Sequence, residues 1–347
     1  MKYTFSILIL LSGLTCACQK EEISLSTHTS ETFYVDNAGA SMRVLVEGNT
    51  ASKAVIIIVH GGPGSTAYIY NTDYVGSHLE DKYAIAYWDQ RNAGASQGGD
   101  DGSDLVLSQY VEDLKKVIQV IKYRYGKDIS VFILGHSFGG LLTTAFLTKD
   151  DYQYMVKGWI CVDGTHDYGL NDTLTRQMLL EVGQEQVAEN KHVSDWNPII
   201  DYCNVHSGNF TLDESAQLES YATDAETYMD SVNQVNALAL FKQFAFKDDI
   251  PLTSILFNYL YTSNSELAEN LSHANYTPEL YKITVPTMLM WGKYDFVCPI
   301  GLAVDIYLRI QSTQKKLVIS QVSGHNFLFQ DDSLFCASVA DFVGKNK

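Results

Sequence analysis

Short apolar runs recur along the chain and alternate with segments whose apolar residues follow a helical spacing. Residues 54–59, 129–134 and 287–291 are such runs, and each predicts a strand that is buried on both faces of a sheet. Residues 108–125 place their apolar side chains on one face, as an amphipathic helix does. The alternation predicts an α/β fold with a mostly parallel, doubly wound sheet and right-handed crossovers.

Residues 166–277 break this alternation. The segment has helical patterns, many tyrosines and asparagines, and 17 Asp and Glu against 4 Lys and Arg. These counts give a net charge of −13, which is most of the −17 that the whole chain carries. We therefore expect one core, formed by residues 33–165 and 278–347, with an inserted α-helical lid at residues 166–277.

A G-x-S-x-G motif occupies residues 135–139, directly after the predicted strand 129–134 and before a run that predicts a helix. A serine on such a strand-to-helix turn is exposed above the sheet, and its small neighbours allow the tight turn and the close packing of helix on strand. The context favours a nucleophile at Ser137 over a glycine-rich turn without chemistry.

The partners of this serine follow from chain order, which in serine hydrolases with this turn is Ser, then Asp or Glu, then His. His325 is the only histidine beyond position 295, and it follows an apolar strand. Asp295 follows the predicted strand 287–291 and is the expected acid, although it would also suit a turn or a helix cap. Asp305 is the weaker alternative because it falls within the next predicted helix. In this scheme His325 is the general base, and Asp295 orients and stabilises its ring.

Negative charge develops on the substrate oxygen in this chemistry and needs preset hydrogen-bond donors. The backbone N–H of Phe138 is one expected donor, because it follows the nucleophile. The second comes from the loop after the strand 54–59, which reads HGGPG at residues 60–64. His60 and His136 are expected to support these loops, and Asp89 and Arg91 to hold the fold as an ion pair or a loop cap.

Several motifs occur in a recognisable order: HGGPG at 60–64, WDQRNAGAS at 88–96, YVEDL at 110–114, and then the serine motif. Together they resemble the prolyl iminopeptidase-type branch of the α/β-hydrolases, over residues 33–163 and 278–347. The resemblance implies an α/β-hydrolase fold, a helical lid over the nucleophile, and Gly62 as the second backbone donor.

This chain departs from that branch at the serine motif. His136 and Phe138 stand where Gly and Trp are usual, and Asn92 stands where Gly is usual. The fold and the reaction class are compatible with these changes, so the resemblance still implies a serine hydrolase that acts through an acyl-enzyme. An aminopeptidase or iminopeptidase acting on short peptides is the first expectation. An esterase or lactonase acting on small acyl compounds is the alternative. The third hypothesis is a lipoprotein at the cell surface that has the hydrolase fold and binds a ligand without catalysing a reaction.

The net charge of the chain argues against two classes of partner. A net charge of −17 and a pI near 4.8 argue against binding to nucleic acid or to anionic lipid. The chain contains no H-E-x-x-H and no C-x-x-C motif, so we expect neither a metal nor a cofactor. The cysteines beyond the N-terminal segment allow disulfides without requiring them; they are Cys161, Cys203, Cys298 and Cys336.

The N-terminus predicts a targeting signal. Lys2 precedes the apolar residues 5–11, a stretch too short to span a bilayer. Ala17-Cys18 then resembles the cleavage point of a bacterial lipoprotein signal, with an ordinary secretory signal as the alternative. We expect a signal peptide at 1–17, lipidation of Cys18 (Cys16 is the fallback), a tether at 18–32, and a lipoprotein exported to the periplasm or the cell surface. The lipid would be its only contact with the membrane.

Overall fold

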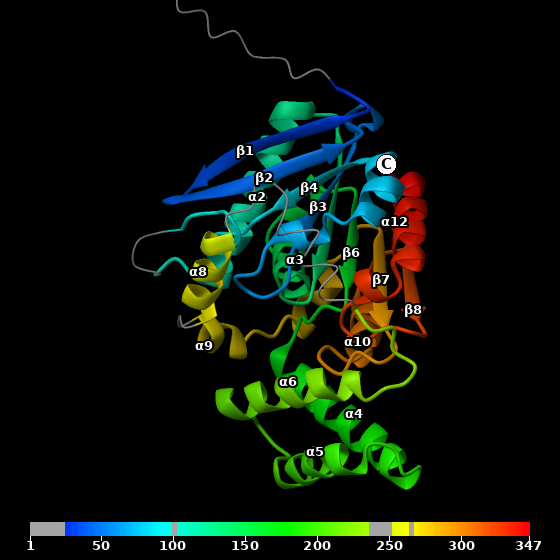
Figure 1. The fold of residues 1–347 in the computed structure, drawn as a ribbon. Helices are drawn as coiled ribbons and strands as arrows, with labels where there is room; N and C mark the ends of the chain where they lie inside the picture. The colour runs from blue at the N-terminus through cyan, green and yellow to red at the C-terminus, as the bar shows by residue number, and fades with distance from the viewer. Residues whose placement is uncertain (1–24, 99–102, 236–251, 264–266) are drawn as a thin grey trace, which may run out of the picture.

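A computed structural model describes residues 25–98, 103–235, 252–263 and 267–347 of the chain (Figure 1). The predicted signal peptide with Cys16, and the predicted lipidation site Cys18, lie outside the described residues. Within the described ranges, no helix is long and apolar enough to cross a membrane.

One eight-stranded sheet organises the molecule, in the order β1-β2-β4-β3-β5-β6-β7-β8. The strands β3 to β8 run parallel, and β1 and β2 form an antiparallel hairpin that adds to the edge at β4. This arrangement confirms the predicted mostly parallel sheet. The strands are β1 (Thr29–Asn37), β2 (Ala40–Gly48), β3 (Ala54–Val59), β4 (Ala84–Trp88), β5 (Ser130–His136), β6 (Gly158–Val162), β7 (Thr287–Gly292) and β8 (Lys315–Ser320).

The strand β1 corrects the expected tether. It begins at Thr29, inside the range 18–32, and pairs residue by residue with β2. As an edge strand it exposes alternate polar side chains to solvent, which gives it the composition of a linker. The described sheet therefore begins four residues before the expected core boundary at residue 33.

Helices cover both faces of the sheet, as Figure 1 shows. Alternate residues of one strand point to opposite faces: Ile57 packs in the apolar cluster with α2 and α3, and Ile56 in the cluster with α12. The sheet is therefore doubly wound. The helices of the core are α1 (Asp73–Val75), α2 (Leu107–Tyr125), α3 (Phe138–Thr148), α10 (Gly301–Arg309), α11 (Phe327–Gln330) and α12 (Asp332–Asn346), with short turns η1 (Thr50–Ser52), η2 (Ala67–Tyr70), η3 (Gly76–Glu80), η4 (Tyr152–Met155) and η5 (Thr277–Lys282).

The described residues between β6 and β7 are mostly helical. Its described helices are α4 (Tyr168–Ala188), α5 (Val193–Val205), α6 (Leu212–Thr227), α8 (Leu252–Ser263) and α9 (Leu267–Ser272). Its two ends are tied together, since the Tyr168 N–H donates to the Ala274 carbonyl (3.1 Å) and the Tyr276 N–H to that of His166 (2.9 Å). These bonds lie at the boundaries expected for the insertion.

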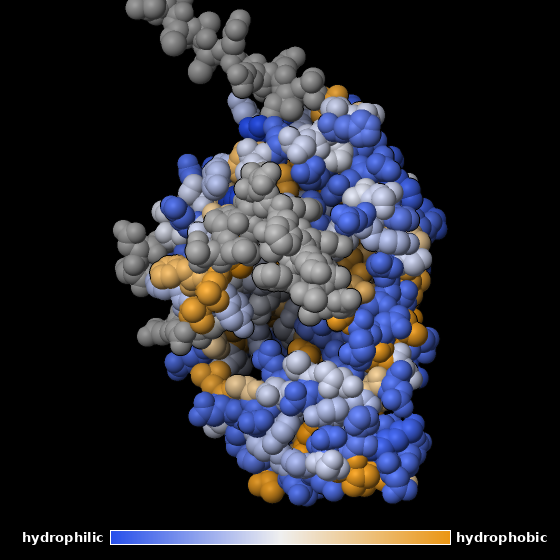
Figure 2. All heavy atoms as spheres, viewed as in Figure 1, coloured by the Kyte–Doolittle hydropathy of each residue, from blue (hydrophilic) through white to orange (hydrophobic). Residues whose placement is uncertain are grey.

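Helices α4, α5 and α6 form a layer beyond one end of the sheet, with an apolar cluster of their own around Trp196 and Leu179 (Figure 1). Phe296, from the loop after β7, also belongs to this cluster. The outer surface of the layer is mostly hydrophilic (Figure 2). Helix α8 instead contacts the core, where the Asn258 amide donates to the carbonyls of Gly94 and Ser96.

Candidate active site

Ser137 lies on the turn between β5 and α3 with φ 55° and ψ −122°, a conformation that a non-glycine residue rarely adopts. Its neighbours show why the turn needs glycine. A Cβ at Gly139 would overlap the Val59 carbonyl oxygen, and one at Gly135 would overlap the Gly139 carbonyl oxygen. The helix therefore starts hard against the sheet, and the serine projects from the end of β5.

Three side chains from three strand ends meet at this point. The His325 Nε2 lies 3.0 Å from the Ser137 Oγ, and its Nδ1 lies 3.1 Å from the Asp295 Oδ2. A carboxylate accepts, so Nδ1 carries the hydrogen and Nε2 is left to accept from the serine hydroxyl. The structure thus brings together the three residues that the sequence indicated, in the order needed for proton transfer.

The alternative acid lies elsewhere. The Asp305 carboxylate contacts the His166 Nε2 at 3.1 Å and the Arg309 Nε at 2.6 Å. Asp295 is completely buried, and its Oδ1 accepts the Cys298 N–H at 2.7 Å, which fixes the carboxylate under the imidazole.

His325 is surrounded by carboxyl groups. Burial alone lowers the pKa of its imidazole, but Asp295, Asp163 and Glu226 outweigh that effect and raise the pKa to about 9. Three acids around one base make the protonated imidazole unusually stable here.

Asp163 was not anticipated. It follows β6, its Oδ1 accepts the Gly292 N–H (2.8 Å), and its Oδ2 accepts the Phe327 N–H (3.2 Å). Burial, and next the charge of Asp295, hold its pKa well above the usual range. The side chain joins the ends of β6 and β7 to the helix after His325. An Asp directly after a predicted strand was an available signal for this position.

Glu226 was also missed, because nothing in the sequence separates it from the other acids of the insertion. It lies near the end of α6, is 8% exposed, and its Oε1 accepts the His325 N–H at 2.9 Å. Burial, and next Asp295, raise its pKa to about 8. The insertion therefore places one carboxyl group against the backbone of the histidine.

The backbone N–H groups near Ser137 differ in whether they have an acceptor within the protein. The Gly61 N–H donates to the Tyr70 hydroxyl (3.3 Å), and the Ser137 N–H donates to the Val162 carbonyl (3.2 Å). Among the described residues, none accepts the N–H of Gly62 or of Phe138. Gly62 has φ 111°, which glycine adopts readily, and it follows the residue that packs against the Ser137 Cβ.

The two supporting histidines act as structural groups. The His60 Nε2 accepts the Gln90 N–H at 3.2 Å, so its Nδ1 donates to the Gly61 carbonyl at 2.7 Å. His136 bonds to Tyr70 and to the His325 carbonyl. Both rings therefore brace the loops around Ser137.

Asp89 and Arg91 hold the fold, but they do so with different partners. The Asp89 carboxylate accepts from the Thr66 hydroxyl and from the N–H groups of Ala67 and Ala95. Arg91 is fully buried and pairs with Asp113 at 2.5 Å. Each anchors a loop to its own neighbours.

All four cysteines that the structure describes are free and buried. No group of three or more His, Cys, Asp or Glu side chains in that part could hold a metal ion.

A family model described as serine aminopeptidase, S33, matches residues 50–238, more than half of the chain. A proline iminopeptidase of Saccharolobus solfataricus is 24% identical over 305 residues, covering 84% of this chain and 85% of the relative. A probable aminopeptidase of Bacillus subtilis, YbaC, is 20% identical over 303 residues, covering 86% and 91%.

Solved structures share the fold. The proline iminopeptidase-related protein of Thermus thermophilus superimposes with a TM-score of 0.59 at 16% identity, covering 92% of this chain and 98% of that one. An esterase from Exiguobacterium antarcticum gives a TM-score of 0.57 at 19% identity, with coverage of 90% and 100%. The chain therefore belongs to the serine aminopeptidase S33 family and is a serine hydrolase with the α/β-hydrolase fold.

Proposed function

We propose that the protein is an aminopeptidase, similar to the iminopeptidases, that releases the N-terminal residue of short peptides. Ser137, His325 and Asp295 are its catalytic residues, and the N–H groups of Gly62 and Phe138 bind the oxyanion. The observation that carries the proposal is the continuous hydrogen-bonded line from the Ser137 Oγ through His325 to Asp295. The names of the relatives, proline iminopeptidases and a probable aminopeptidase, support the substrate class.

The reaction proceeds in two steps, acylation of Ser137 and hydrolysis of the acyl-enzyme. The Ser137 oxygen attacks the carbonyl carbon of the first peptide bond while its proton passes to the His325 Nε2. The negative oxygen that forms is stabilised by the two backbone N–H groups. His325 then gives the proton to the departing amine, which leaves Ser137 acylated. A water molecule, deprotonated by the same imidazole, releases the acyl group and restores the serine.

A carboxylate near Ser137 can recognise the free amine of the substrate through an ion pair. Glu226 is the acid of α6 that reaches the backbone of His325, which itself contacts Ser137. A buried carboxylate with a raised pKa is stabilised when an ammonium group approaches it. We assign Glu226 as the group that receives the substrate amine.

The test compares an aminoacyl-arylamide with its N-acetylated twin at fixed pH. Truncating one partner of a desolvated charged pair costs about 2–5 kcal/mol, so the acetylated twin should be at least about 30-fold poorer in kcat/KM. Glu226→Gln keeps an oxygen that can accept the His325 N–H but removes the charge. It should therefore reduce the ratio of kcat/KM for the free-amine substrate to kcat/KM for the acetylated twin. The change that the same variant causes in the pKa of His325 acts on both substrates and cancels in this ratio.

Asp224→Asn is the matched control, since Asp224 is exposed on the same helix and the change removes the same charge. It should retain the preference. Equal rates on the two substrates in the unmodified enzyme, or the same loss in both variants, would contradict the assignment.

Esterase activity is the second candidate, and one observation favours it. Helix α8 exposes Leu256, Phe257 and Leu260, the orange patch at the left of Figure 2. The same helix packs on the HGGPG loop, where a Cβ at Gly64 would lie 2.8 Å from the Thr262 Cβ. A helix that contacts this loop and also carries exposed apolar side chains offers a surface for a neutral acyl group. A clear preference for neutral p-nitrophenyl esters over aminoacyl-arylamides would establish this alternative.

A further inference from the structure

The histidine of the serine motif, His136, contacts two loops of the active site. Its Nε2 lies 2.9 Å from the His325 carbonyl oxygen, and its Nδ1 lies 2.7 Å from the Tyr70 hydroxyl. The Tyr70 hydroxyl in turn lies 3.3 Å from the Gly61 nitrogen. One set of hydrogen bonds thus connects the HGGPG loop, the turn at Ser137 and the loop that carries His325.

The direction of every bond in this set is determined. A carbonyl only accepts, so the His136 Nε2 carries the hydrogen. Burial, and next the neighbouring His325, lower the pKa of His136 to about 3, so the ring is neutral and its Nδ1 accepts. Tyr70 must therefore donate to Nδ1 and accept from the Gly61 N–H.

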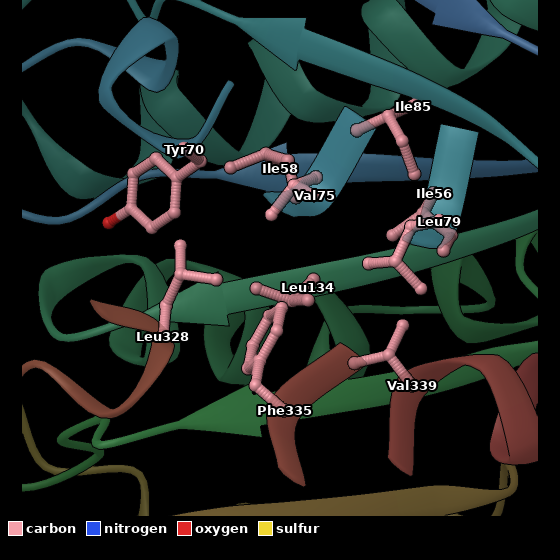
Figure 3. A pocket seen from close by; sticks show the side chains of 10 residues that line it. All are labelled: Ile56, Ile58, Tyr70, Val75, Leu79, Ile85, Leu134, Leu328, Phe335 and Val339. Atoms are coloured by element: carbon pink, nitrogen blue, oxygen red, sulfur yellow. The ribbon is translucent and has the colours of Figure 1, made fainter. Parts of the chain in front are cut away.

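The ring of Tyr70 anchors this set in the core. Figure 3 shows the ring at one end of a small apolar cavity with Ile58, Leu328 and Phe335, while the hydroxyl points away from the other lining side chains. Burial raises the pKa of Tyr70 well above its usual value, so the hydroxyl keeps its proton. Apolar packing fixes the ring, and the hydroxyl forms hydrogen bonds with the Gly61 N–H and the His136 ring.

We propose that Tyr70 and His136 are positioning residues that hold the oxyanion loop and the catalytic histidine in register with Ser137. The inference rests on the proposed roles of Ser137, His325 and Gly62. By binding the Gly61 N–H, Tyr70 orients that peptide and leaves the next N–H, that of Gly62, for the substrate oxygen. By binding the His325 carbonyl, His136 fixes the backbone that carries the general base.

This role predicts a loss in the chemical step rather than in substrate binding. Tyr70→Phe keeps the ring and its packing and removes only the hydroxyl. With an acetylated arylamide or a neutral ester, kcat should fall about 10-fold, the change that a barrier increase of about 1.4 kcal/mol produces. KM should change less than about 2-fold, because the interaction acts in the transition state.

Tyr83→Phe is the matched control. Tyr83 is also buried against the face of the sheet that α12 covers, and its hydroxyl donates to the Ala340 carbonyl at 3.0 Å. The variant loses one buried tyrosine hydroxyl far from Ser137 in the fold. It should keep kcat while showing a comparable loss of thermal stability.

A second variant makes the test independent of Tyr70. In His136→Gln the amide NH₂ can occupy the position of Nε2 and keep the hydrogen bond to the His325 carbonyl. The variant loses Nδ1, which accepts the hydrogen bond from Tyr70. Tyr70→Phe and His136→Gln then break the same bond, so the double variant should be no more than about 2-fold slower than the slower single one.

Each outcome decides the inference. A kcat for Tyr70→Phe equal to that of Tyr83→Phe, a loss expressed in KM alone, or additive losses in the double variant would overturn it. Loss of activity in Ser137→Ala, measured in parallel, tests the proposed function separately, because that result does not depend on Tyr70.

Discussion

The parallel core and the helical insertion bury their residues to very different extents. All six residues of β3 are buried, whereas the 21-residue helix α4 buries only Thr175, Leu179 and Gly183. A side chain at the end of a fully buried strand has little freedom, which suits chemistry that depends on distances near 3 Å. The described helices of the insertion expose most of their residues, and exposed segments supported by a rigid core often determine the choice of substrate.

The two regions nevertheless meet at the loops that carry Asp295 and His325. The Trp196 ring of α5 lies 6.0 Å from that of Phe296, the residue after Asp295. Glu226 of α6 accepts the His325 N–H. The insertion therefore also takes part in positioning groups of the core.

The largest expected effect separates Asp295 from Asp305, a second acid of the core that bonds to the start of the insertion at His166. Ser137→Ala or His325→Ala should lower kcat by about 10⁶-fold, and Asp295→Asn by about 10⁴-fold. Asp305→Asn is the matched control, because this acid bonds to His166 and Arg309 instead. Steady-state kinetics on one arylamide give all four values. A variant at Asp295 with near-normal turnover would show that another group orients the imidazole.

A pair of glycines compares the packing of the two regions. Gly139→Ala places a methyl group against the Val59 carbonyl and should cost at least about 1–3 kcal/mol of unfolding free energy. Gly208→Ala lies in the loop between α5 and α6 with no atom within 4 Å of the new Cβ, and should change the stability by less than about 1 kcal/mol. Thermal melts of both variants measure the difference. Equal melting temperatures would mean that the turn at Ser137 is looser than the structure shows.

A smaller effect concerns Glu226, the acid of the insertion that raises the pKa of His325. His325 must be neutral to accept a proton, and its pKa is raised to about 9, so kcat/KM should rise with pH through that region. Glu226 contributes to the raised pKa together with Asp295 and Asp163, while His136 stays neutral. Removing one negative neighbour lowers the pKa of the imidazole. Glu226→Gln should therefore move the rising limb of the plot of kcat/KM against pH to lower pH.

The limb is best measured with a neutral ester, whose own charge does not titrate. Asp224→Asn serves again as the control and should leave the limb in place. A shift of the Glu226→Gln limb to higher pH would contradict the sign of this interaction.

The sequence predicted the core better than the insertion for a physical reason. Strands buried on both faces are short apolar runs, and parallel strands end at one edge, so Ser137, Asp295 and His325 could be placed together from their positions after such runs. Asp163 follows β6 in the same way and was within reach of that argument. The hairpin strand β1 was not, because an edge strand with exposed polar residues resembles a linker.

The interactions between regions left no comparable trace in the sequence. Glu226 is one of 17 acids in residues 166–277, and only the packing of α6 on the His325 loop distinguishes it. Tyr70 lies on a short turn, η2, with no periodic pattern, and its role depends on the distance of its hydroxyl from two other loops. Such contacts depend on tertiary structure, which residue spacing along one chain does not encode.

The most direct test of the account is covalent labelling of the protein with a fluorophosphonate, followed by identification of the modified peptide. The probe reacts with a serine only when a neighbouring base activates it and donors stabilise the resulting oxyanion. We expect a single phosphonylated residue, Ser137, with labelling lost in His325→Ala and kept in Asp305→Asn. Absence of labelling in the folded protein, or labelling at another serine, would contradict the claim that three strand ends of the core form a working hydrolase site.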